Sequence, residues 1–393
     1  MSYVIAAVIL LLAVVFLAGV IPPRTRRKDS DGQHDHGDHD HGVDWDSVAN
    51  DFDPVHEAKD VTGGCKFDPE EVRRTALLQG PPIDMDNIPS PDARVAALLN
   101  QVDAGWVRDR ITKLSGGTPA NFDGKSVTIR SRNSFTDGVG VAMDYVESFY
   151  RDLGIAVRRI PYRAAGRTFF DLEATIPGKK DPKKVLIVGA HLDSTAGWTR
   201  SKEKEAPGAD DDASGTVAVM QIAAALAQLP LDYTVRVVHF TGEEQGLWGS
   251  YAYADMLNDE VKKDGVEVIG MLQHDMVGYS PNTKARLDVH DEKDRNGSRA
   301  LLVLYFRNIK RYGIALNPYD THNYAVKNRS DHAGFLNHGF KAIMFSEEFT
   351  DEGFNPNYHQ TTDTVDKLNI PFIVEVIKGG IALSADLAGI QPE

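Results

Sequence analysis

Short apolar segments alternate with helical patterns from about residue 90 to the end of the chain. The segment KVLIVGAHLDS, residues 184–194, is apolar at nearly every position up to its histidine, as expected of a central strand that is buried on both faces. A helical pattern follows at 214–228, and the next apolar segment begins at 233. This alternation predicts an α/β fold, a three-layer sandwich with a mixed, largely parallel central sheet and helices on both faces.

Cap and turn signals delimit the other expected elements. Helices are expected at 90–116, which begins with Ser-Pro, at 138–154, which ends in glycine, and at 370–390, with proline in the first turn. Strands are expected at 156–163, 167–178, 233–244, 266–279 and 340–349. We expect these elements to form one domain over residues 90–393.

The first 28 residues have a different composition. The segment from Tyr3 to Ile21 contains no charged residue, and as a helix it would be about 28 Å long, close to the thickness of a bilayer core. A cleavable signal peptide is the alternative, but only the N-terminal amine is basic before this segment and no Ala-x-Ala site follows it. We therefore expect residues 1–28 to be an uncleaved membrane anchor with a basic flank at 24–28.

Residues 29–89 are expected to be an acidic, histidine-rich linker and lead-in. The part from 29 to 46 is too polar to form a core, which is typical of a disordered tether. Its histidines could also bind metal loosely. They are His34, His36, His39 and His41.

Charge and cysteine content exclude several classes of protein. The chain has 43 Lys and Arg against 57 Asp and Glu, a formal net charge of −14, and no basic stripe. Nucleic acid is therefore not an expected partner. The single cysteine, Cys65, excludes an intrachain disulfide and a zinc site made of several cysteines.

Three consecutive aspartates, Asp210–Asp212, precede the predicted helix at 214–228. A helix N-terminus stabilises one carboxylate through its free N–H groups and its dipole, but three neighbouring carboxylates repel one another. A solvated acidic turn is one interpretation of this cluster. A bound cation is the other, and the residues at the strand ends favour it.

Histidine and carboxylate side chains follow the predicted central strands. Because sites in such folds lie outside the carboxyl ends of the strands, we expect these side chains to gather there. Imidazoles and carboxylates are suitable ligands for zinc, and a carboxylate close to a ligating imidazole can orient it. The candidates are His191, Asp193, Asp211, Glu243, Glu244, Asp275 and His359.

Six motifs resemble, in order and context, those of the di-zinc aminopeptidase family, whose relatives include glutamate carboxypeptidase II, the glutaminyl cyclases and the transferrin receptors. The motifs are GAHLDS, PGADDDASG, GEEQGLWGS, HDMVGY, SDHAGF and YHQTTDT. The resemblance covers about residues 135–390. It implies an exopeptidase that holds two zinc ions per chain and removes N-terminal amino acids from peptide substrates.

The resemblance also implies a metal ligand set. His191 and Asp275 would bind one zinc ion, and Glu244 and His359 would bind the other. Asp211 would bridge the two ions, which explains why an acidic cluster occurs at this helix start.

The remaining matched residues would act beside the metal ions. Glu243 would be the general base, and Tyr358 would stabilise the oxyanion of the tetrahedral intermediate. Asp193 would orient His191. The resemblance further implies a cis peptide bond after the bridging aspartate, in a turn that Asp212 helps to hold, whereas we expect Asp210 to face solvent.

Three other functions fit parts of these motifs. A carboxypeptidase within the family would need basic groups for the substrate carboxylate, and the sequence does not place them. A glutaminyl-cyclase-like enzyme would hold one zinc ion, but such relatives tend to carry an insertion where GEEQGLWGS is compact. A non-catalytic receptor-like domain would have lost metal ligands that this chain retains. Trp198, Tyr319 and Tyr324 are weak candidates for lining a substrate pocket, while Asp331 and His332 are expected to be structural.

Two observations predict opposite locations for the domain. The basic flank at 24–28 predicts a cytoplasmic domain by the positive-inside tendency. Family members with an apolar N-terminal segment are mostly exported, and a long domain can be translocated despite an unfavourable flank. We expect a membrane-anchored peptidase whose domain is extracytoplasmic, with a cytoplasmic domain as the alternative.

Overall fold

The computed structural model describes residues 82–197, 202–281, 284–321, 326, 328–350 and 352–391. The expected membrane anchor and the histidines of the linker lie outside these residues. Within the described ranges, no helix is both long enough and apolar enough to cross a membrane.

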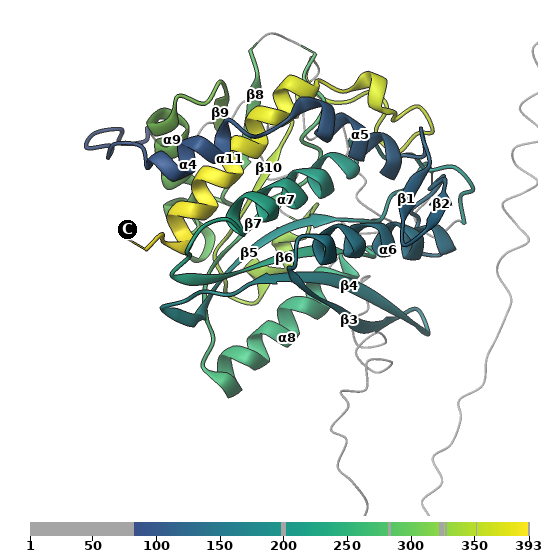
Figure 1. Ribbon diagram of the computed structural model, residues 1–393, viewed down its shortest axis with the longest axis horizontal. Coiled ribbons are helices and arrows are strands. Elements are labelled where there is room, and N and C mark those ends of the chain that lie inside the picture. The colour runs from purple at the N-terminus through teal and green to yellow at the C-terminus, as the bar shows by residue number, and fades with distance from the viewer. Residues whose placement is uncertain are drawn as a thin grey trace, which may run out of the picture. The chain divides into compact units, whose positions relative to one another are not determined.

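An eight-stranded sheet in the order β3-β4-β6-β5-β7-β10-β8-β9 forms the middle layer (Figure 1). Strands β6, β5, β7 and β10 are mutually parallel at the centre, whereas β3 and β4 are antiparallel at one edge and β8 is antiparallel to β10. The predicted mixed, largely parallel sheet is confirmed. The strands are β3 (Ala156–Ala164), β4 (Arg167–Ile176), β5 (Asp181–His191), β6 (Tyr233–Phe240), β7 (Glu267–His274), β8 (Arg286–His290), β9 (Asn317–Thr321) and β10 (Ala342–Ser346).

Helices cover both faces of this sheet (Figure 1). The larger apolar core contains side chains of α4 (Ala93–Leu99), α5 (Ala104–Leu114), α6 (Asp137–Asp152), α7 (Ala213–Leu226), α9 (Arg299–Tyr312) and α11 (Ile370–Ala388). The smaller core contains side chains of α8 (Trp248–Asp264) and α10 (His332–Asn337). The described residues also form a short hairpin, β1 (Ala120–Phe122) with β2 (Lys125–Val127), and 3₁₀ turns at Arg295–Gly297 and Val365–Lys367.

The central strand β5 shows why the sheet needs helices on both sides. Leu186 and Val188 belong to the larger core, while Val185 and Ile187 belong to the smaller one. Successive side chains of a strand point to opposite faces, so an uninterrupted apolar run requires two apolar layers. The three-layer sandwich predicted from this run is confirmed.

The segment 90–116 differs from its prediction. It forms two helices, α4 and α5, instead of one. The side chain of Asp103 accepts a hydrogen bond of 2.6 Å from the backbone N–H of Trp106, so it caps a new helix start and interrupts the helical pattern. Helices α8, α9 and α10 and strands β8 and β9 were not among the expected elements.

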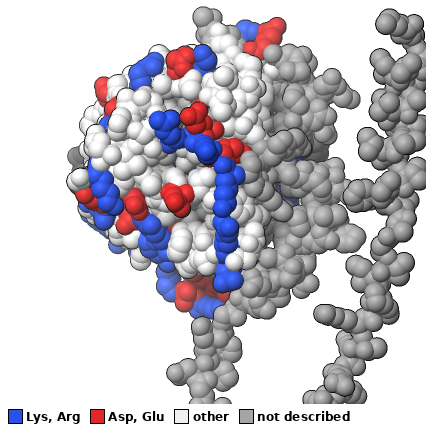
Figure 2. Space-filling view, turned by 90° about the vertical axis from the view of Figure 1, so that its right-hand side faces the viewer, with Lys and Arg blue, Asp and Glu red and all other residues white. Residues whose placement is uncertain are grey.

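Charged side chains of both signs lie next to one another on the face shown in Figure 2. Surface pairs of this kind include Arg151 with Asp123, at 2.6 Å, and Lys263 with Asp259, at 2.8 Å. Exposed pairs such as these contribute little to stability. The carboxylates of Glu243, Glu244 and Asp275 differ from them, because they are buried at the ends of the central strands.

Candidate metal centre

The carboxyl ends of the central parallel strands carry most of the predicted site residues. His191 is the last residue of β5, and its neighbour in β6 is Phe240, three residues before Glu243. Asp275 directly follows β7, on the other side of β5. The parallel register therefore brings side chains from distant sequence positions to one edge of the sheet.

Asp211 lies between the two candidate histidines. Its Oδ1 is 3.1 Å from His191 Nε2, and its Oδ2 is 3.2 Å from His359 Nε2. Asp275 Oδ1 lies 3.6 Å from the same His191 nitrogen, while Glu244 Oε2 lies 2.9 Å from the His359 nitrogen. The five residues thus form two groups, one at each oxygen of the Asp211 carboxylate, and these groups are those that the resemblance implied.

Unpartnered polar atoms allow a test of whether a cation fits here. Both Oε atoms of Glu244 and Nε2 of His359 are buried and make no well-directed hydrogen bond, although Oε2 and Nε2 are 2.9 Å apart. Buried carboxylates without partners are costly, so such atoms require an explanation. A cation would satisfy them, and the atoms offered by His191, Asp211 and Glu244 lie within 4.8 Å of one another, as do those of His191, Glu243 and Asp275. This donor set of imidazoles and carboxylates fits zinc.

Burial and close carboxylates control the protonation of these groups when no cation is present. Burial raises the pKa of Glu244 to about 7. Burial alone would lower the pKa of His359, but the carboxylates of Glu244 and Asp211 outweigh it and raise that pKa to about 10. Burial, together with repulsion from Glu244 and Asp275, also raises the pKa of Glu243 well above its usual range. Without a cation, Glu243, Glu244 and His359 therefore favour their protonated forms, whereas the two histidines lower the pKa of Asp211.

Asp212 joins three elements around the centre. Its carboxylate accepts hydrogen bonds from the backbone N–H groups of His191 at 3.1 Å, Gly215 at 2.9 Å and Met276 at 3.2 Å. It thereby caps α7 and ties the end of β5 to the residue after Asp275. The peptide bond between Asp211 and Asp212 is cis, so that prediction is confirmed.

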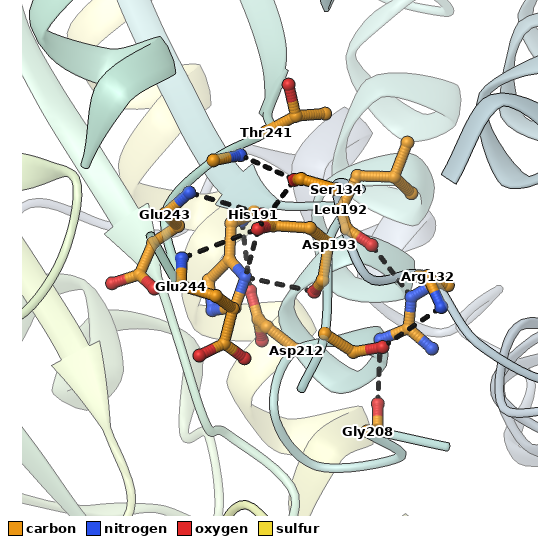
Figure 3. A network of polar contacts seen from close by, with 12 residues as sticks. Arg132, Ser134, His191, Leu192, Asp193, Gly208, Asp212, Thr241, Glu243 and Glu244 are labelled. Atoms are coloured by element: carbon orange, nitrogen blue, oxygen red, sulfur yellow. Dashed lines mark hydrogen bonds and ion pairs between the residues drawn. The ribbon is translucent and has the colours of Figure 1, made fainter. Parts of the chain in front are cut away.

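Asp193 connects His191 with the glutamate pair (Figure 3). Its carboxylate accepts the backbone N–H groups of Glu243 at 3.3 Å and Glu244 at 3.4 Å, and its Oδ1 lies 3.6 Å from His191 Nδ1. The carbonyl oxygen of Asp193 is also 3.2 Å from that nitrogen. Asp193 thus positions the backbone of both glutamates in addition to facing the imidazole.

Asp210 does not face solvent, so that expectation is wrong. The side chain is fully buried, with Oδ1 accepting the N–H of Gly278 at 2.8 Å and Oδ2 accepting Asn355 Nδ2 at 2.8 Å. It is also hydrogen-bonded to the carboxyl group of Glu347, and burial raises the pKa of both groups. A hydrogen bond between two carboxyl groups requires a proton on one of them, and the raised pKa values of Asp210 and Glu347 favour that protonated form.

Ser134 and Asp363 also contact the centre but were not among the candidates. Ser134 Oγ donates to Asp193 Oδ2 at 3.0 Å and accepts the N–H of Gly242 at 3.0 Å (Figure 3). The Asp363 carboxylate accepts the N–H groups of Asp210 and Asp211, each at 3.1 Å. The only sequence signal was that Asp363 lies inside the motif YHQTTDT.

The aromatic candidates have different surroundings. Tyr358 is half-buried and its ring stacks on that of His359, with centroids 3.7 Å apart. Tyr319 lies under the guanidinium of Arg286, which is 3.9 Å from the ring centroid. Trp198 and Tyr324 lie outside the described residues.

Asp331 and His332 contact side chains other than the candidate ligands, although the charge of Asp331 interacts with those of His191 and Asp275. Asp331 Oδ2 accepts Gln273 Nε2 at 3.1 Å, and burial raises the pKa of Asp331 to about 7. His332 Nε2 lies 3.3 Å from Glu292 Oε1. These contacts are compatible with the structural roles expected of both residues.

Comparison with known proteins identifies relatives of this arrangement. A family model described as peptidase family M28 matches residues 171–381. A probable zinc metalloprotease of Pyricularia oryzae is 26% identical over 352 residues, covering 77% of this chain and 68% of the relative. A probable leucine aminopeptidase of Arthroderma benhamiae is 30% identical over 306 residues, covering 76% of this chain and 77% of the relative.

The fold of the chain also occurs in solved structures. The aminopeptidase LapA of Legionella pneumophila superposes with a TM-score of 0.61 at 21% identity, covering 79% of this chain and 78% of LapA. The chain spans between 59% and 68% of the length of four probable zinc metalloproteases among its relatives.

Proposed function

The chain belongs to peptidase family M28 and is a metallo-aminopeptidase, and on this premise we propose that it removes single residues from the N-terminus of peptides with two zinc ions per chain. The observation that carries the proposal is the position of Asp211. Its two carboxylate oxygens face two different histidines, each accompanied by a further carboxylate. A single cation held by His191, Asp211 and Glu244 would leave Asp275 and His359 without a role, whereas two cations would use all five side chains.

The ligand assignment follows from these distances. His191 and Asp275 would hold one ion, Glu244 and His359 would hold the other, and Asp211 would bridge them. When bound, the two zinc ions would lower the pKa of a water molecule and polarise the scissile carbonyl group.

The chain's own side chains would transfer protons and stabilise charge. Glu243, buried beside His191 and Asp275, would take a proton from the attacking water and pass it to the leaving amine. Tyr358, stacked on His359, would donate its hydroxyl proton in a hydrogen bond to the developing oxyanion. Water thus adds across the first peptide bond, giving a free amino acid and a shortened peptide.

An assay with paired substrates tests the proposed reaction. The purified full chain, loaded with zinc, is given aminoacyl-nitroanilides with a free amine and the same compounds with an acetylated amine. We expect hydrolysis of the free compounds only, because the carboxylate-lined site favours an ammonium group. A peptide with N-terminal glutamine, analysed by mass spectrometry, is the second substrate, and loss of its C-terminal residue or conversion of its glutamine to pyroglutamate without hydrolysis would contradict the proposal.

We also propose that the segment from Tyr3 to Ile21 attaches the enzyme to a membrane, with the peptidase domain on the extracytoplasmic side. The support is the uncharged composition of this segment, which lies outside the described residues. The basic flank at 24–28 favours the cytoplasmic alternative.

A further inference from the structure

Arg132 is a fully buried cation, and it lies next to the candidate metal centre (Figure 3). Its guanidinium makes four hydrogen bonds to main-chain carbonyl groups of the described residues. Nε donates to the carbonyl of Leu192 at 2.7 Å, and Nη2 donates to that of Gly208 at 2.8 Å. Nη1 donates to the carbonyls of Leu114 at 2.9 Å and Pro207 at 2.6 Å. A buried arginine is usually paired with an acidic side chain, so a set of carbonyl acceptors requires an explanation.

Three of the four acceptors belong to two loops beside the candidate ligands: the His191 loop, which begins directly after His191 at the end of β5, and the Asp211 loop before α7. Leu192 directly follows His191, and Gly208 lies three residues before Asp211. The remaining acceptor is the carbonyl of Leu114, which is the last residue of α5. One planar guanidinium therefore fixes the separation of the loop that carries one histidine from the loop that carries the bridging aspartate.

Backbone contacts of the same segment support this arrangement. The N–H of Arg132 donates to Ser194 Oγ at 3.2 Å, and that hydroxyl donates to the carbonyl of Ala206 at 2.8 Å. The N–H of Ala206 donates to the carbonyl of Arg130 at 2.9 Å. The segment around Arg132 thus lies between the two loops and bonds to both.

The charge of Arg132 also acts on the acidic loop. Burial lowers the pKa of Arg132. The negative charges of nearby carboxylates partly offset this effect; they belong to Asp212, Asp363, Asp193 and Asp211. In turn, this fixed positive charge offsets part of the repulsion among them. Because its hydrogen bonds go to carbonyl groups, the arginine leaves the carboxylates available for other partners.

We propose that Arg132 is a positioning residue of the metal centre, which holds the His191 loop and the Asp211 loop at the separation that zinc binding requires. The proposal rests on the proposed function, because it assumes that zinc binds between these loops. Residues that position metal ligands without touching the metal commonly change metal affinity by about 10–100-fold when they are replaced.

The test measures zinc affinity of the full chain by competition with a chromogenic chelator, together with the thermal midpoint of the metal-free protein. Arg132→Lys keeps the charge but cannot reproduce the planar set of donors, and Arg132→Met removes both. We expect zinc affinity to fall about 10-fold in the first variant and about 100-fold in the second. Arg299→Lys is the matched control, since Arg299 forms a largely buried ion pair with Asp291 and Asp320 on another part of the fold.

One outcome would overturn the role of Arg132, and a different outcome would overturn the proposed function. If the wild type binds zinc and the Arg132 variants bind it equally tightly, while their thermal midpoints fall as in Arg299→Lys, Arg132 only supports packing and the inference is overturned. If the wild type itself binds no zinc, the proposed function fails instead. Arg132→Lys alone decides the question if Arg132→Met does not fold.

Discussion

At the scale of single residues, two neighbouring glutamates are assigned different tasks. Glu244 Oε2 lies 2.9 Å from His359 Nε2, whereas the carboxylate of Glu243 lies near the imidazole of His191 and the carboxylate of Asp275. We expect Glu243→Gln to keep both zinc ions and to lose about 10²–10⁴-fold in kcat, because only the proton transfer is removed. Glu244→Gln is the matched comparison and should lose zinc. Zinc content by mass spectrometry and kcat check both, and the reverse pattern would show that the roles are exchanged.

The protonation of His359 predicts how zinc binding depends on pH. Its pKa is raised to about 10 in the metal-free protein, above the value of about 6.5 in an unfolded chain. The stability that this raised pKa gives to the metal-free fold is therefore fully present below about pH 6.5 and is lost as the pH rises towards 10. Because zinc needs the neutral imidazole, binding near pH 7.5 should release protons, and zinc affinity should rise with pH.

Calorimetry measures this proton release directly. Zinc is titrated into the metal-free chain in buffers of different ionisation enthalpy. The slope of the observed binding enthalpy against the buffer ionisation enthalpy gives the number of protons released. We expect about one proton or more, since Glu244, with a pKa of about 7, contributes as well. A slope of zero, or an affinity that falls as the pH rises, would contradict the assignment of His359 as a ligand.

At the scale of elements, the loop before α7 has no space for a side chain at Gly208. A Cβ atom there would lie 2.2 Å from the carbonyl oxygen of Asp211 and 2.6 Å from Ser194 Cβ, at a φ of +49°. Gly313, at the end of α9, has a φ of +61° and open space around it. Alanine at either position has the cost of a left-handed backbone, about 1 kcal/mol, but only Gly208→Ala also displaces the ligand loop.

Urea unfolding and zinc content separate these two effects. We expect Gly313→Ala to lose about 1 kcal/mol of unfolding free energy and to keep its zinc. Gly208→Ala should lose more stability and also lose zinc affinity. Equal losses of stability with unchanged zinc in both variants would show that the loop adapts without moving Asp211.

The elements also show how much of the site could be predicted from the sequence. His191, the glutamate pair and Asp275 could be placed together because each follows an apolar strand, and parallel strands end at one edge. His359 lies on a loop with no such signal, so its assignment depended on the resemblance. The partners of Asp210, Ser134 and Arg132 could not be predicted, because these contacts join segments far apart in the sequence.

At the scale of the whole molecule, the location of the domain is a prediction from the first 28 residues. We expect protease added to intact cells or spheroplasts to degrade the domain at 90–393, because the proposed anchor leaves it outside. Lysed cells are the control for protease activity and access. Protection of the domain until the membrane is lysed would support the cytoplasmic alternative, which the basic flank at 24–28 favours.

The measurement that tests the two-zinc centre most directly is anomalous diffraction at the zinc edge from crystals of the purified chain. We expect two peaks about 3.5–4 Å apart, one on each side of the Asp211 carboxylate. One peak should be coordinated by His191 and Asp275 and the other by Glu244 and His359. A single peak, as in the one-zinc alternative, or peaks that do not contact Asp211, would contradict the account.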